Sequence, residues 1–252
     1  MNNSIQLIKF TNLALALIPV LVVVGIFYKW SLNYRNALYA IFRMLVQLLL
    51  IGYFLIYIFE SNSPWIVILI LAVMVSASSW ISLHTIKAKR KVFYKRALFS
   101  ITVGGGTTLL LITQGVLDLH PWYWPRYMIP LAGMIFANAM NSVSLAAERL
   151  EAELARNVHY EKARSIAFRA SLIPITNSLF AVGLVSLPGM MTGQILSGIS
   201  PLIAVRYQIM VMCMIFGSAG ISSACFLLLA KPKEQKFTLN VKKLFNSTKP
   251  WT

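Results

Sequence analysis

Seven apolar stretches run through this chain, and most are long enough to cross a lipid bilayer as a helix. A crossing helix needs about 20 residues, because the hydrocarbon core is about 30 Å thick and a helix rises about 1.5 Å per residue. The sequence therefore predicts an all-α integral membrane protein of about seven transmembrane helices. The predicted spans are Phe10–Tyr28, Ala37–Phe59, Pro64–Leu83, Ala97–Leu117, Tyr127–Ala147, Leu172–Pro188 and Ile203–Ala230.

The composition argues against a water-soluble fold. Of the 252 residues, 58% are hydrophobic and 12% are charged, whereas a soluble domain carries about 25% charged residues. A domain of this size cannot bury that much apolar surface in water, but a bilayer solvates it. We expect one polytopic membrane domain over residues 1–230, followed by a basic cytoplasmic tail over residues 231–252.

The basic residues set the predicted orientation. The net charge is +16, and 19 of the 23 Lys and Arg residues lie in the segments 29–36, 84–96, 148–171 and 231–252. Because cytoplasmic loops are enriched in Lys and Arg, these segments are predicted to be cytoplasmic and the N-terminus to be outside. Their placement beside apolar spans favours anionic lipid headgroups as partners rather than nucleic acid.

The sequence contains no pattern that supports catalysis. The phosphate-binding pattern G-x-x-x-x-G-K-[ST] is absent, since Gly104-Gly105-Gly106-Thr107 has no lysine. None of the seven acidic residues lies well inside a span, and the three histidines lie in separate loops. Ion-coupled carriers and intramembrane hydrolases usually need such groups. We therefore expect that the chain does not hydrolyse ATP through a phosphate-binding loop and that it binds no cofactor of its own. The glycine cluster is expected to let helices approach closely.

Two cations lie within predicted spans or at their ends. Arg43 lies in the second span with Gln47 one turn later, and Arg206 begins the seventh span. A charge inside the bilayer is costly unless it is paired or hydrated. Either these side chains reach back to the interface, or they form a polar lining for an anionic or chelated substrate.

Small, amide and methionine side chains supply the other candidates for a transport path. The fifth span carries Gly133 and Ala137 at the four-residue spacing of a close helix contact, and Gly189 and Gly193 repeat that spacing in the turn before the seventh span. One interpretation of these residues is close helix packing. The other is a transport path lined by amides and soft methionine sulfurs. The candidates are Asn138, Asn141, Met190, Met191 and Gln194.

The segment 148–171 concentrates charge of both signs. It holds four of the seven acidic residues, and Arg149 and Glu153 have the i,i+4 spacing of a helical ion pair. We expect the fifth span to continue into the cytoplasm as a charged helix. It is either a solvated linker or a docking element for a cytoplasmic partner, in which case the candidate residues are Glu148, Arg149, Arg156 and Arg164.

Three stretches resemble a known family. They are Ile129–Leu145, Ile173–Gln194, with Val182-Gly183-Leu184-Val185-Ser186-Leu187-Pro188-Gly189, and Ile199–Met210, with Ala204-Val205-Arg206-Tyr207-Gln208. They resemble the FetB-like permeases, which are bacterial membrane subunits assigned to iron export and related to a plant permease of aluminium tolerance. Family members carry a longer cytoplasmic segment with a Leu-Gly-Ala-Thr-Pro-like turn, whereas Glu148–Ser171 has no glycine.

The resemblance implies an ABC-type permease that forms a homodimer in the bacterial inner membrane, crosses it several times and is served by a separate FetA-like cytoplasmic ATPase. It implies a role in iron export and metal homeostasis. Iron favours carboxylate, imidazole or thiolate ligands, and the sequence shows no cluster of them. Export of a nucleotide sugar or another organic anion is therefore an alternative, and a membrane scaffold without transport is a second one.

Overall fold

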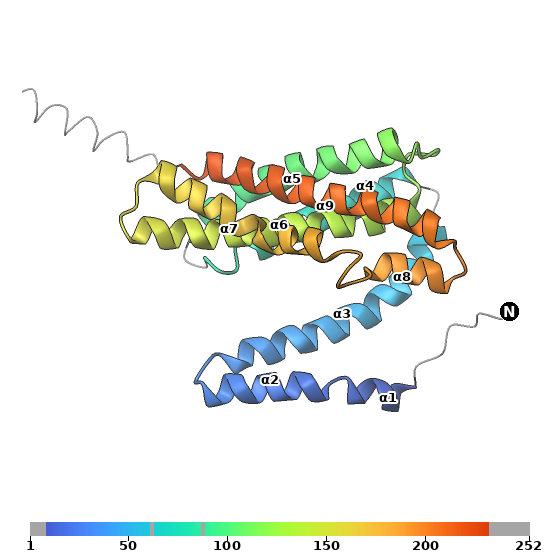
Figure 1. The fold of residues 1–252 in the computed structure, drawn as a ribbon, viewed down its shortest axis with the longest axis horizontal. Coiled ribbons are helices and arrows are strands. Elements are labelled where there is room, and N and C mark those ends of the chain that lie inside the picture. The colour runs from blue at the N-terminus through green and yellow to red at the C-terminus, as the bar shows by residue number, and fades with distance from the viewer. Residues whose placement is uncertain (1–8, 61–62, 87–88, 232–252) are drawn as a thin grey trace, which may run out of the picture. The chain divides into compact units, whose positions relative to one another are not determined.

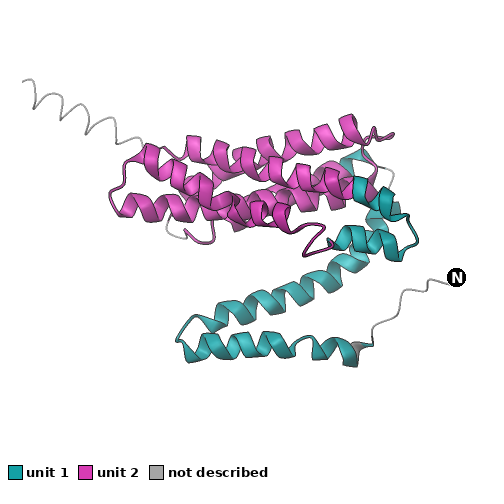
Figure 2. Cartoon of the chain, in the orientation of Figure 1, with its two compact units in different colours: residues 1–66, 188–206 teal, residues 67–187, 207–252 magenta. Residues whose placement is uncertain are grey.

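The computed structural model describes residues 9–60, 63–86 and 89–231, and the elements in these residues are helices (Figure 1). The chain divides into two compact units, unit 1 with residues 1–66 and 188–206 and unit 2 with residues 67–187 and 207–252 (Figure 2). Beyond Lys231, the predicted basic tail lies outside the described residues. The elements are α1 Phe10–Leu15, α2 Ile18–Lys29, α3 Tyr34–Glu60, α4 Pro64–Ser82, α5 Arg90–Leu110, the π-helix η2 Leu111–Val116, α6 Pro125–Ala155, α7 Tyr160–Ala181, α8 Gly189–Leu196 and α9 Pro201–Leu229.

Within the described residues, six helices are long and apolar enough to cross a membrane, which confirms the all-α membrane class. They are Thr11–Lys29, Tyr34–Glu60, Pro64–Ser82, Arg90–Val116, Pro125–Ala155 and Pro201–Leu229. Each overlaps a predicted span, and the predicted span Leu172–Pro188 is not among them.

The region of the sixth predicted span is built differently from the expected apolar helix. Helix α7 begins at Tyr160 and ends at Ala181, so its first half is charged and its apolar half is short. The chain leaves the helix at Val182, and Gly183 has a φ of 84°, which glycine tolerates and a right-handed helix does not contain. The following segment, expected as a turn, contains the eight-residue helix α8.

In unit 1, α2 and α3 form a hairpin of two apolar helices. They contact each other, and the rings of Tyr28 and Tyr34 meet edge to face with centroids 5.6 Å apart. No described residue of either helix is buried. An apolar surface of this extent is typical of contact with hydrocarbon or with another protein rather than with water.

Unit 2 packs tightly at the glycine cluster of α5. A Cβ added at Gly104 would lie 2.6 Å from the backbone nitrogen of Ser222 on α9, and one at Gly105 would lie 2.8 Å from the ring of Phe136 on α6. The predicted close approach at this cluster is confirmed. The hydroxyl of Ser100 donates to the carbonyl of Arg96 at 2.7 Å. The hydroxyl of Ser222, which faces Gly104, is buried and has no hydrogen-bond partner among the described residues. Small residues on both helices allow this close approach.

At the other two small-residue positions for which close packing was one interpretation, the described residues show no approach as close as that at Gly104. A Cβ at Gly133 would meet the Met74 methyl at an ordinary 3.5 Å. Within unit 1, no described atom lies within 4 Å of a Cβ at Gly189 or Gly193. Four-residue spacing of small residues marks a face on which helices can approach, but it does not require that they do.

A four-residue turn joins α6 to α7. The amide of Asn157 donates to the carbonyl of Leu154 at 3.0 Å, and the amide of Val158 donates to that of Glu153 at 3.1 Å. Together with the φ of 60° at Asn157, these bonds form a Schellman motif, in which asparagine is the usual substitute for glycine. The charged helix expected from residue 148 onward therefore ends at Ala155, and the chain turns back as a hairpin although the segment has no glycine.

Candidate docking groove and transport path

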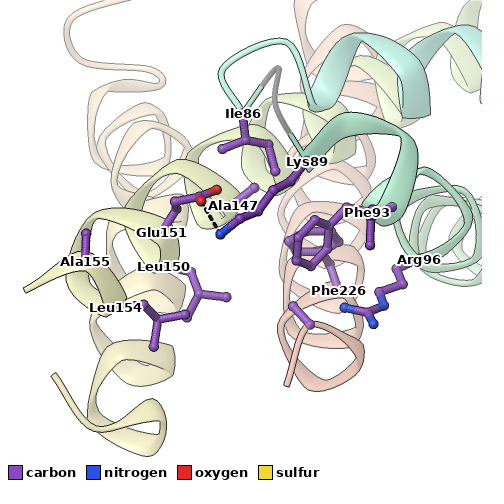
Figure 3. A pocket seen from close by; sticks show the side chains of 12 residues that line it. Ile86, Lys89, Phe93, Arg96, Ala147, Leu150, Glu151, Leu154, Ala155 and Phe226 are labelled. Carbon is purple, nitrogen blue, oxygen red and sulfur yellow. Dashed lines mark ion pairs between the residues drawn. The ribbon is translucent and has the colours of Figure 1, made fainter. Parts of the chain in front are cut away.

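A groove lies at the end of unit 2 where α5 begins and α6 and α9 end; we call it the basic-end groove (Figure 3). Its volume is about 650 Å³, and its walls come from Ile86, from residues 89–96, from Ala147–Ala155 of α6 and from the end of α9 with Ala230. The rings of Phe93 and Phe226 pack with centroids 6.0 Å apart on one side. Leu150 and Leu154 lie on the other side.

One ion pair and one cation–ring contact lie among the residues that line this apolar groove. Figure 3 shows Lys89 reaching across to Glu151, where its ammonium lies 2.6 Å from the carboxylate. This pair joins the start of α5 to α6 and is 36% to 58% exposed, so it contributes at most about 1 kcal/mol. The guanidinium of Arg96 stands 4.9 Å from the centre of the Phe93 ring. Among the described residues, no carboxylate lies within 4 Å of Arg96.

Two polar contacts hold helix ends together beside the groove. Tyr160 is 1% exposed, and its hydroxyl donates to the carbonyl of Leu227, one of the last carbonyls of α9. Such carbonyls have no partner within their own helix. Burial raises the pKa of the Tyr160 hydroxyl, so it is a donor at neutral pH. The guanidinium of Arg90 likewise donates to the carbonyl of Trp80 near the end of α4, at 2.6 Å.

Three of the four predicted docking residues form ion pairs within the hairpin. Arg149 lies 2.7 Å from Glu153, which confirms the predicted i,i+4 pair, and Arg156 lies 3.9 Å from the same carboxylate. Arg164 lies 2.6 Å from Glu161. Glu148 is exposed. The sequence did not indicate the groove itself, because Phe93, Glu151 and Phe226 come from segments far apart in the chain.

The eight candidate path residues lie in both units. Arg43 and Gln47 lie on α3, Met190, Met191 and Gln194 on α8, and Arg206 at the start of α9, all in unit 1, whereas Asn138 and Asn141 lie on α6 in unit 2. The cations Arg43 and Arg206 are exposed. The amide of Asn138 donates to the carbonyl of Met134 at 2.8 Å, so part of its polarity is satisfied within α6.

One further polar residue was not singled out as a site. Gln208 of α9 is 5% exposed, and its Oε1 has no hydrogen-bond partner among the described residues. A buried amide oxygen without a partner is costly in a membrane helix, and such positions often mark a functional site. Its glutamine side chain within an apolar helix was the available sequence signal.

Residues 10–233 match the model of the Uncharacterised protein family (UPF0014). The chain belongs to this family. It is 34% identical to the "Probable iron export permease protein FetB" of Escherichia coli, with 92% of this chain and 95% of the relative covered. It is 34% identical to the "Protein ALUMINUM SENSITIVE 3" of Arabidopsis thaliana, with 87% and 85% covered. It is 38% identical to the "UPF0014 membrane protein slr1647" of Synechocystis, with 69% and 73% covered. No solved structure matches it significantly.

Family membership confirms the resemblance seen in the sequence. This is a family of membrane permeases that includes an iron export relative. With its several apolar helices, the chain is a multi-pass membrane protein. Its relatives are named as permeases and membrane proteins, which agrees with the expected role as a transporter component.

Proposed function

We propose that the chain is the permease component of an iron exporter, energised by a separate cytoplasmic ATPase and working as a homodimer in a bacterial inner membrane. The similarity to FetB over nearly the full length of both chains carries this proposal. The absence of a phosphate-binding loop from the whole sequence supports a separate energy source.

The basic end of unit 2 is the proposed docking face for the ATPase. Helix α6 has 31 residues and so measures about 46 Å, which exceeds the roughly 30 Å hydrocarbon core. The excess falls at its charged end, after Ala147, where the hairpin to α7 begins. This end carries Glu148, Arg149, Arg156 and Arg164 and would face the cytoplasm in the proposed orientation.

Orientation can be tested with reporter fusions. With the N-terminus outside, fusions at Asn62, Lys89, Asp118 and Arg156 are expected to read outside, inside, outside and inside, because the basic segments stay in the cytoplasm. The seventh crossing then includes the apolar half of α7 and the non-helical stretch 182–187 that follows it. Irregular backbone at membrane depth is tolerated where protein or a cavity surrounds it. A cytoplasmic signal at Asp118 would contradict this topology.

Two observations favour an organic anion as the alternative substrate. Arg43 and Arg206 are exposed cations within or at the end of helices long enough to cross the membrane. The described residues contain no group of three or more His, Cys, Asp or Glu that could hold a metal ion. A chelated iron, in which an organic ligand carries negative charge, satisfies both observations.

Transport in vesicles distinguishes the substrates. The chain and its FetA-like ATPase are reconstituted together, and ATP-dependent movement of ferrous iron, an iron chelate and a nucleotide sugar is measured. Transport of iron or its chelate alone supports the proposal. Transport of the nucleotide sugar alone supports an organic anion as the substrate instead. A chain that binds no ATPase and transports none of them fits a membrane scaffold.

The methionines of α8 are the proposed soft ligands along the exit path. Replacing both Met190 and Met191 with alanine is expected to lower iron efflux about tenfold, equivalent to about 1.4 kcal/mol, while expression and ATPase binding stay unchanged. The matched control replaces both with leucine, which keeps the volume but removes the sulfur. If the leucine protein exports normally, the methionines fill space and the assignment as ligands is wrong.

A further inference from the structure

The basic-end groove presents an apolar surface in a part of α6 that carries several charged residues. Between Ala147 and Ala155, α6 carries four charged residues, yet its groove side offers Leu150, Leu154 and the two alanines. This part of α6 lies beyond the apolar span, so in the proposed orientation the groove opens toward the cytoplasm. An apolar groove of this size in water is typical of a protein interaction site.

The charges around the groove favour an acidic partner. Glu151, Glu153 and Glu161 are each paired with cations of the same chain. By contrast, Arg96 lines the groove half-buried, with the Phe93 ring as its contact and no carboxylate within 4 Å among the described residues. A partly desolvated cation is stabilised by an opposite charge, so a carboxylate on the occupant completes the site.

The length of the groove indicates the size of the occupant. Its α6 wall runs from Ala147 to Ala155, which is about 12 Å along a helix and corresponds to about two helical turns. An apolar stripe with one acidic residue on such a helix matches the helix-in-groove mode of recognition.

We propose that the basic-end groove receives a two-turn amphipathic helix of the partner ATPase, with an acidic side chain of that helix against Arg96. This inference rests on the proposed function, because it names how the ATPase binds. The chain's own tail fits the groove less well, since residues 232–252 carry five Lys and one Glu and would bring positive charge to Arg96.

The test fills the groove without removing any contact of the chain. Ala155 is exposed and lines the groove, whereas Ala152 is exposed on the same helix and does not line it. Ala155→Trp is expected to weaken binding of the purified ATPase to the permease in lipid nanodiscs at least about tenfold, and Ala152→Trp is expected to bind as the wild type does. Arg96→Glu is expected to weaken binding by a similar factor, and Arg96→Lys to keep most of it. Size-exclusion profiles of each variant check that it folds.

A photo-crosslinking amino acid at position 155 identifies the occupant directly. A crosslink to an acidic amphipathic helix of the ATPase supports the proposal, whereas a crosslink to residues 232–252 or to lipid overturns it. If the wild type binds the ATPase and Ala155→Trp binds it equally well, the groove assignment fails while the proposed function stands. If the wild type binds no ATPase, the proposed energy source fails, and the groove assignment fails with it.

Discussion

Gly104→Leu is expected to destabilise the folded protein strongly. A Cβ at this position would lie 2.6 Å from the backbone nitrogen of Ser222, and backbone cannot rotate away as a side chain tip can. Overpacking typically costs about 1–3 kcal/mol and sometimes more, and a contact with backbone belongs at the upper end. A loss of about 3 kcal/mol lowers the ratio of folded to unfolded protein more than a hundredfold, which is measured as a lower unfolding temperature and a smaller monodisperse peak after detergent extraction.

Gly106→Leu is the matched control for this prediction. Gly106 lies two residues along the same helix, and no described atom lies within 4 Å of a Cβ added there. Its variant is therefore expected to keep the extraction yield and unfolding temperature of the wild type. Equal loss of both proteins would show that helix propensity or insertion, rather than the contact between α5 and α9, controls the outcome.

The sequence predicted most of the helices because their signal is local. Six predicted spans and the glycine cluster at Gly104 and Gly105 follow from apolar runs and small-residue spacing, and the structure bears them out. The Arg149–Glu153 pair also followed from helical spacing alone. Each of these features depends on neighbours within a few residues of one another.

The features that the sequence missed depend on mixed patterns or on distant contacts. Helix α7 joins a charged first half to an apolar second half, so a search for apolar runs detects only the second half and misplaces its start. The turn at Asn157 uses asparagine where the usual signal is glycine. The groove pairs Lys89 with Glu151 and Phe93 with Phe226, and no periodicity connects residues so far apart in the chain.

Tyr160 is expected to be the most important single side chain for holding the end of α9. Its ring is fully buried and its hydroxyl donates to the carbonyl of Leu227. Tyr160→Ala is expected to lower the free energy of unfolding by about 3–5 kcal/mol, because it leaves a cavity. Tyr160→Phe keeps the ring and leaves the carbonyl unpaired, so it is expected to cost about 1–2 kcal/mol. Unfolding in mixed micelles measures both, with Tyr57→Phe as the control, since Tyr57 is 74% exposed.

The pH dependence of the unfolding free energy distinguishes the contribution of the Tyr160 hydroxyl from that of its ring. Burial raises the pKa of Tyr160 in the folded protein above the ordinary value of 10.0. The unfolded chain therefore loses this proton first as the pH rises, and the contribution of the hydroxyl is complete below pH 10.0 and is lost progressively above it. Tyr160→Phe has no such proton, so the difference in unfolding free energy between wild type and variant is expected to narrow above pH 10.0. A difference that stays constant from pH 8 to pH 11 would mean that the hydroxyl is not bonded to the end of α9.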